Sequence, residues 1–199
     1  MLMLLFPALV LGAVAAVRAG SLAGLRRLRI HWWPLGVGAL AVKVVIHDPP
    51  FNQQTWALEW GPTIWVLCLV AMLAMLVRNA LQPGIARIGW QLAALGLASN
   101  LLVVIANGGY MPQSQPARIA LHGTTLPADA NVTQLWNVVP MTSASHLTWL
   151  GDNFAEPGWV PMANVMSIGD MILSLGMAGL TFQTLRRRSS HFGGTLADS

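Results

Sequence analysis

Long apolar stretches dominate this sequence and limit what it can fold into. There are five of them, at about residues 2–17, 32–46, 61–77, 85–106 and 168–185. Each comes close to the roughly 17–25 residues that a helix needs to cross about 30 Å of hydrocarbon. Only 9% of the residues are charged, against about a quarter in a typical soluble domain. The sequence therefore predicts an all-α, polytopic membrane protein with about five transmembrane helices.

The connection between the last two stretches is the longest part of the chain outside the predicted helices. Residues 107–166 exceed the roughly 12–15 residues beyond which a loop is usually functional or disordered. Leu, Val, Trp and Phe occur throughout this segment, which favours an ordered outer cap, with short helices in "NVTQLWNVV" and "SASHLTWLGD". We expect one integral membrane domain over residues 1–185 and a cytoplasmic tail over 186–199.

The arginines predict the orientation of the chain. They gather in three segments: Arg18, Arg26, Arg27 and Arg29 after the first stretch, Arg78 and Arg87 around the loop after the third, and Arg186, Arg187 and Arg188 after the fifth. With five spans these segments share one side, which the positive-inside rule makes cytoplasmic. The N-terminus is then outside and the C-terminus inside. No basic stripe falls on a soluble domain, so the expected partner is the lipid bilayer and not a nucleic acid.

Tryptophans lie near the ends of the predicted spans. Amphipathic indole rings prefer the headgroup level of a bilayer. The predicted interface anchors are Trp32, Trp33, Trp60, Trp90 and Trp159.

Asp170 is an ionisable residue at the start of the last apolar stretch. Ser167 and Asp170 match the [ST]-x-x-[DE] pattern of a helix capping box, and a carboxylate in the first turn faces the positive end of the helix dipole. The alternative is catalytic: Asp152 and Asp170 are two outer-side carboxylates, and such a pair can share one proton and activate water. Both interpretations stay open from the sequence.

Lys43 and Asn100 are polar residues inside predicted spans. Lys43 lies about 16 Å from the inner boundary, where a bare ammonium costs at least about 2.5–3.5 kcal/mol. We expect it to point outward and to form an ion pair, with Asp170 as the first candidate and Asp48 or Glu59 next. Asn100 is expected to form a hydrogen bond between helices.

The histidines do not have the spacing of a metal site. HxxxH, HExxH and CxxC are all missing from the sequence, so no zinc or iron–sulfur site is predicted. No cofactor is implied by spacing. A haem or chlorophyll needs only one axial His, so a bound pigment stays open.

Three motifs in order carry a resemblance: "NGGYMP", "LTWLGD" and "NVMSIGD". Together they resemble a family of small multi-pass bacterial membrane proteins known only as a domain of unknown function. The resemblance implies a bacterial plasma (inner) membrane and one integral domain, and it carries no functional residue. The last helix alone is also similar in outline to lipoprotein signal peptidase, an intramembrane aspartic protease with two catalytic aspartates. In this chain, however, the Asp follows Asn164 at a longer spacing.

The small size and the lack of convergent catalytic motifs favour an accessory or structural subunit that packs against other membrane proteins and has no catalysis of its own. One alternative is an outer-face intramembrane aspartyl hydrolase that uses Asp152 and Asp170. A second is a small transporter or lipid-binding module that uses Lys43 and Asp170. The separation of the two aspartates distinguishes the first alternative, and a polar cavity reaching Lys43 distinguishes the second.

Overall fold

The computed structural model describes residues 29–84, 86–129, 133–134, 136–161 and 163–186. The described chain is mostly helical. Its α-helices are α2 (Trp33–His47), α3 (Thr55–Ala80), α4 (Arg87–Ala106), α5 (Gln115–His122) and α7 (Ile168–Arg186). Its strands are β1 (Met111–Gln113), β2 (Val138–Pro140), β3 (Phe154–Ala155) and β4 (Val165–Met166), and the 3-10 turns are η2 (Phe51–Gln53) and η3 (Thr148–Leu150).

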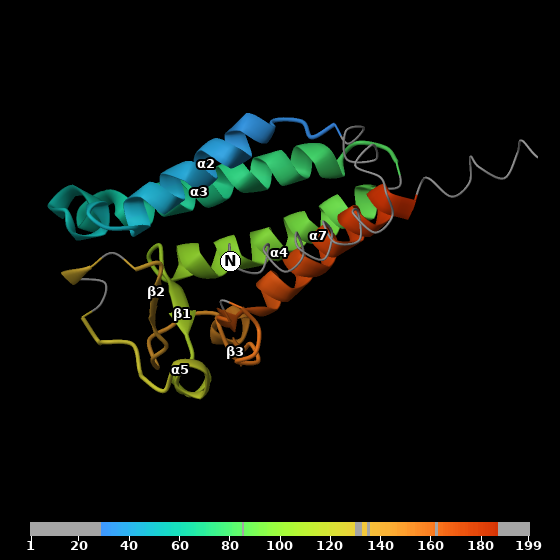
Figure 1. Ribbon diagram of the computed structural model, residues 1–199. Coiled ribbons are helices and arrows are strands. Elements are labelled where there is room, and N and C mark those ends of the chain that lie inside the picture. The colour runs from blue at the N-terminus through green and yellow to red at the C-terminus, as the bar shows by residue number, and fades with distance from the viewer. Residues whose placement is uncertain (1–28, 85, 130–132, 135, 162, 187–199) are drawn as a thin grey trace, which may run out of the picture.

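The four long helices pack side by side, and the rest of the described chain gathers at one end of them. α2 lies along α3, α3 packs on α4, and α4 packs on α7 (Figure 1). The strands and α5 form a small cap near the start of α7 (Figure 1). Two of these helices, α3 and α4, are long and apolar enough to cross a membrane, and shorter apolar helices occur at Trp33–His47 and Ile168–Phe182.

The helix boundaries follow the apolar stretches except in α3. α2, α4 and α7 begin and end within two residues of the predicted spans. α3 begins at Thr55 and ends at Ala80, beyond the predicted 61–77 at both ends, with Pro62 inside the helix. The first predicted span, 2–17, lies outside the described residues, so a five-span topology stays a prediction.

α4 and α7 approach each other closely through glycines. A Cβ atom added at Gly96 would overlap the backbone of Gly169 and Leu173, and one added at Gly176 would overlap the backbone of Ala93. Close contact of this kind supplies van der Waals packing where lipid removes the hydrophobic driving force between helices. The two helices therefore form the most tightly joined pair of the described fold.

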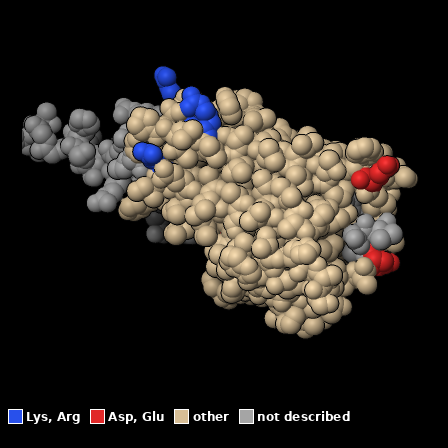
Figure 2. Space-filling model, turned by 180° about the vertical axis from the view of Figure 1, so that it is seen from behind, with Lys and Arg blue, Asp and Glu red and all other residues tan. Residues whose placement is uncertain are grey.

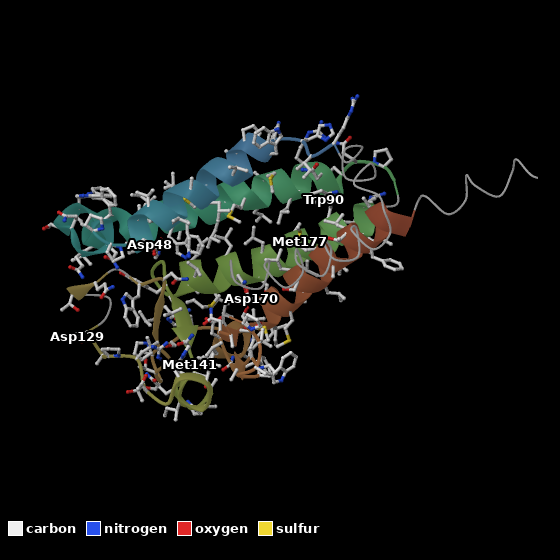
Figure 3. The ribbon with its side chains drawn as sticks, in the orientation of Figure 1. Asp48, Trp90, Asp129, Met141, Asp170 and Met177 are labelled. Atoms are coloured by element: carbon white, nitrogen blue, oxygen red, sulfur yellow. The ribbon has the colours of Figure 1, made fainter. Side chains whose placement is uncertain are left out.

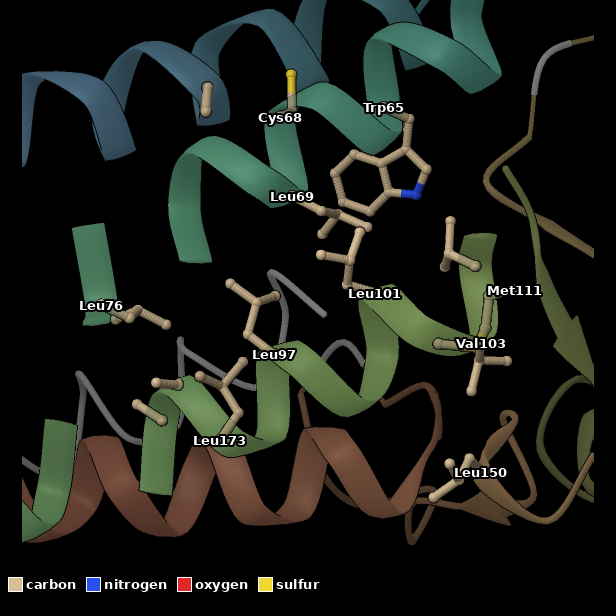
Figure 4. Close-up of a cluster of buried hydrophobic side chains, with 14 of the residues drawn as sticks. Trp65, Cys68, Leu69, Leu76, Leu97, Leu101, Val103, Met111, Leu150 and Leu173 are labelled. Atoms are coloured by element: carbon tan, nitrogen blue, oxygen red, sulfur yellow. The ribbon is translucent and has the colours of Figure 1, made fainter. Parts of the chain in front are cut away.

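The apolar core fills the space between the helices. Leu69 of α3, Leu97 of α4 and Leu173 of α7 meet at its centre (Figure 4). At the cap end Trp65 and Met111 continue the same cluster (Figure 4). The cap thus shares a continuous core with the helices.

The cap is built from short strands more than from helices. β1 pairs in parallel with β2, Gln113 of β1 also bridges to Asp152, and β3 pairs antiparallel with β4. The helix predicted in "NVTQLWNVV" lies partly outside the described residues, and the last two residues of this stretch begin β2. The helix predicted in "SASHLTWLGD" is not formed, because this stretch contains only the turn η3. The helix of the cap is α5, which the sequence analysis did not predict.

One asparagine fastens the cap to the end of α4. The Asn107 side chain donates to the carbonyl of His146 at 2.9 Å, and its oxygen accepts from the N–H of the same residue at 2.9 Å. The chain can turn there because Gly109, with a φ of +94°, packs directly against Pro62 of α3. A two-point bond to one residue fixes the position of the cap segment.

We expect Gly176→Ala to destabilise the fold by about 1–3 kcal/mol, because the new methyl group must displace the α4 backbone. The matched control is Gly179→Ala on the same helix, where a Cβ has nothing within 4 Å. Thermal unfolding of the purified variants in detergent measures both. Equal unfolding temperatures for the two variants would contradict the close packing of α4 against α7.

Candidate functional site

Asp170 stands in the first turn of α7 and is held by Ser167. The Asp170 N–H donates to the Ser167 hydroxyl oxygen at 2.9 Å, and the Asp170 carboxylate accepts the Ser167 N–H at 3.3 Å. These are the two reciprocal bonds of a capping box. Asp170 is only 3% exposed, and Ser167 is fully buried. The sequence Ser-x-x-Asp therefore starts the helix inside the protein.

Asn100 of α4 completes this polar cluster. Its side-chain nitrogen donates to Oδ1 of Asp170 at 2.7 Å, and its oxygen accepts the Ser167 hydroxyl at 2.8 Å. The approach is possible because a Cβ at Gly169 would overlap the Asn100 side chain. The hydrogen bond expected of Asn100 between helices is thus formed with α7.

Asp152 comes from the cap, directly after η3. Its N–H donates to the carbonyl of Pro112 at 3.0 Å, and its carbonyl accepts the N–H of Ser114 at 2.8 Å. Its side chain is 6% exposed, and Oδ1 is buried with no hydrogen-bond partner among the described residues. Strand β1 therefore fixes the backbone of Asp152 and leaves one carboxyl oxygen free.

The fold brings Asp152 and Asp170 to one cavity. The cavity has a volume of about 20 Å³, which is room for about one water molecule. Figure 3 shows Asp170 where α7 meets the cap, while Asp48 and Asp129 lie farther out. The residues that line the cavity are Trp65, Leu69, Asn100, Val104, Met111, Asn137, Asp152 and Asp170.

The environment of Asp152 favours its protonated form. Burial is the main cause and the negative charge of Asp170 the second, and together they raise the pKa of Asp152 to about 8. Asp170, by contrast, has the Asn100 amide and the Ser167 N–H as donors and faces the positive end of the α7 dipole. At neutral pH the raised pKa of Asp152 therefore keeps this carboxyl group protonated.

Lys43 lies beside an aromatic ring and not beside Asp170. Its ammonium is 5.8 Å from the centroid of the Trp65 ring, and no ion pair joins it to Asp170 in the described part of the chain. Lys43 does not line the cavity; Trp65 does. An aromatic face attracts a cation, and the charge of Asp48, another of the predicted partners, also acts on Lys43.

The predicted tryptophan anchors divide into two groups. Trp32, Trp33, Trp60 and Trp159 are exposed, Trp159 by 83%. Trp90 is only 6% exposed and belongs to the apolar core. This differs from the prediction, because the position of Trp90 in the first turn of α4 turns its ring toward the other helices. An anchoring role of the exposed rings stays a prediction.

Two site residues were missed by the sequence analysis. Gln113 is buried beside Asp152, and Asn137 lines the cavity. Both lie in strands or next to strands that pair only in the folded cap, so no local pattern marks them. Within the described residues, no group of three or more His, Cys, Asp or Glu side chains could hold a metal ion.

Comparison with known proteins yields one match. The model of a family of unknown function (DUF5317) matches residues 27–182. No curated protein and no solved structure matches the chain.

The pKa of Asp152 predicts how stability depends on pH. The folded chain holds this proton up to about pH 8, whereas an unfolded Asp loses it near pH 4. Between these values the free energy of unfolding should fall as the pH rises, by up to about 1.4 kcal/mol per pH unit, and the fall should end above pH 8.

Unfolding of the wild type and of Asp152→Asn in detergent, at pH 5 to 9, measures this effect. The neutral amide should remove this part of the slope. An identical pH dependence in the two proteins would mean that Asp152 is not protonated in the folded chain.

Proposed function

Since the chain belongs to DUF5317, a family of unknown function, we propose its function from its own geometry: an integral membrane hydrolase of the aspartyl type, with Asp152 and Asp170 as the catalytic pair. One observation carries the proposal. Two carboxyl groups from segments far apart in sequence line the same buried cavity and interact electrostatically. An aspartyl mechanism needs such a pair, with one proton between the two groups.

The exposed side chains support a membrane location. Large apolar residues cover the outer faces of the long helices, among them Trp60 and Leu67 on α3, Leu102 on α4 and Leu175 on α7. Apolar surface of this extent is rare on a soluble monomer and common where lipid is the solvent. Together with the apolar length of α3 and α4, it favours a polytopic protein of the bacterial inner membrane.

The charges support the predicted orientation. On the face seen in Figure 2, the visible Lys and Arg side chains lie toward one end of the molecule and the visible Asp and Glu side chains toward the other. The exposed basic residues Arg29 and Arg87 flank α2 and α4 at one end, whereas Asp48 and Glu59 lie at the opposite ends of α2 and α3. By the positive-inside rule the basic end is cytoplasmic, which puts the cap and the aspartate pair at the outer face, with the N-terminus outside and the C-terminus inside.

The proposed reaction adds water to an acyl bond. Asp170, as the carboxylate, accepts a proton from water while the water oxygen attacks the carbonyl carbon, and Asp152 donates its proton to the carbonyl oxygen. When the tetrahedral intermediate collapses, the bond from carbon to nitrogen or oxygen breaks, the leaving group takes the proton from Asp170, and one hydroxyl of the intermediate returns a proton to Asp152. The products are a carboxylic acid and an amine or alcohol, so atoms and charge balance.

The other two predicted functions have less support in the geometry. The transporter would need a polar cavity that reaches Lys43, yet Lys43 stands beside Trp65 and does not line the cavity. The accessory subunit would need an apolar flank of small residues for its partner, but the glycines of α4 and α7 pack against each other. Binding of the chain to other membrane subunits stays a prediction.

Cysteine labelling tests the proposed orientation. In a Cys68→Ala background, a cysteine at exposed Thr124 of the cap should react with a membrane-impermeant maleimide in intact spheroplasts. A cysteine at exposed Pro83, in the loop between α3 and α4, should react only after the membrane is permeabilised. Reaction of the Pro83 variant alone would reverse the orientation, and equal reaction of both would contradict the membrane-spanning arrangement.

Heavy-oxygen water tests the proposed hydrolysis without a known substrate. Host membranes that contain the protein are incubated in H₂¹⁸O, and peptides and lipids with one new ¹⁸O in a carboxylate are identified by mass spectrometry. Asp152→Asn and Asp170→Asn should each lower the yield of these products by at least about 10²-fold, since each variant removes an acid–base group.

The matched control is Asp129→Asn, which changes an exposed carboxylate of the cap and should leave the yield unchanged. If no labelled product depends on the wild-type protein, or if the two active-site variants match the wild type, the hydrolase proposal fails. Co-purification of a stoichiometric membrane partner in that case would favour the accessory subunit.

A further inference from the structure

Gln113 is a buried polar residue of the cap that lies beside Asp152. We propose that Arg118 is a positioning residue that fixes the side-chain amide of Gln113 and so sets how tightly Asp152 holds its proton. The catalytic meaning of this inference rests on the proposed function, but the proton on Asp152 can be measured directly.

Backbone pairing puts Gln113 next to Asp152. The backbones of the two residues pair in a parallel bridge at the end of β1. Directly paired residues in neighbouring strands place their side chains on the same face. Both side chains are buried, and the Gln113 side chain is a hydrogen-bond neighbour of the Asp152 carboxyl group. What Gln113 presents to Asp152 therefore depends on which way its amide is turned.

Arg118 decides that orientation. Its guanidinium donates from Nη1 to Oε1 of Gln113 at 3.3 Å. Because a guanidinium has only donors, the Gln113 oxygen must face Arg118, and the NH₂ group must face away from it, toward Asp152. An NH₂ group can only donate, so it binds a carboxyl oxygen that bears no proton. The proton of Asp152 is then left to Oδ1, the oxygen without a hydrogen-bond partner among the described residues.

The fold holds Arg118 in this place. It lies on α5 within one turn of Ser114, whose carbonyl accepts the Arg118 N–H at 3.0 Å. Its guanidinium carbon is 5.8 Å from the centroid of the Trp136 ring, and its Nε is buried. A guanidinium stays charged at any physiological pH, so the Gln113 amide has the same orientation whatever the state of Asp152.

The charged groups around Asp152 come from three elements. Asp170 of α7 faces it across the cavity, Arg118 of α5 reaches Gln113, and Lys43 of α2 lies beside Trp65, which lines the cavity from α3. Arg118 could also act directly as a positive charge, without Gln113. Direct attraction and action through Gln113 both lower the pKa of Asp152, so a single variant cannot separate them.

A double-mutant cycle distinguishes direct attraction by Arg118 from its action through Gln113. Gln113→Met keeps the length of the side chain but removes the donor, and Arg118→Met frees the amide to rotate. The full-length protein in detergent is titrated by infrared spectroscopy, with the carboxyl signal of Asp152 identified by its loss in Asp152→Asn. Each single variant should raise the pKa of Asp152, so that the carboxyl group binds its proton about tenfold more tightly.

In the double variant the pKa of Asp152 should rise only as far as in Gln113→Met alone, because Arg118 acts only through Gln113. Arg87→Met at the opposite end of the helices is the control and should change nothing. Additive shifts would show direct attraction instead, and an unchanged titration in both single variants would leave Arg118 a merely structural role; either result overturns the inference. Should Gln113→Met not fold, Gln113→Leu takes its place in the same cycle: it removes the same donor, so a pKa of Asp152 that rises no further when Arg118→Met is added supports action through the amide, and a further rise overturns it.

The two proposals fail separately. If the titrations shift as expected but heavy oxygen is never incorporated, the positioning of Gln113 by Arg118 stands and the hydrolase does not. If hydrolysis occurs, its pH profile should shift in the two single variants together with the titration of Asp152.

Discussion

The buried contact of Asn100 with Ser167 and Asp170 is the interaction on which the site depends. It uses all three side chains at once: the amide donates to the carboxylate and accepts the hydroxyl, and the carboxylate also caps α7. In a low-dielectric interior such a network is stable only when every member is satisfied. The start of α7 is therefore fixed against α4 in one register. This places Asn100 and Asp170 in the wall of the cavity.

The capping and catalytic interpretations of Asp170, which are alternatives in the sequence, are compatible in the fold. Capping supplies hydrogen-bond donors and the positive end of a helix dipole to the Asp170 carboxyl group. Asp152 is buried as well, but one of its carboxyl oxygens has no hydrogen-bond partner among the described residues. This difference arises from backbone context and not from residue type. A helix cap can thus also be one member of an acid–base pair.

Much of the fold could be predicted from the sequence, and less of the site. Apolar length alone predicted α2, α4 and α7 to within two residues, because a long apolar stretch marks a whole helix and not single contacts. Trp90 was misplaced because exposure depends on which way a helix faces, which the weakly amphipathic α4 does not reveal. Asp152 and Asp170 were named as a possible pair, whereas Gln113 and Asn137 were not, because they meet the site only through strand pairing across the cap.

The glycine contacts between α4 and α7 also determine how the cavity can open. With Gly96 and Gly176 at backbone contact, α7 cannot turn or slide without displacing α4, so Asp170 is a fixed point. The remaining walls come from α3, through Trp65 and Leu69, and from the cap, through Asp152. A molecule larger than water needs more room than the cavity of about 20 Å³ offers, and these are the walls on which that room depends.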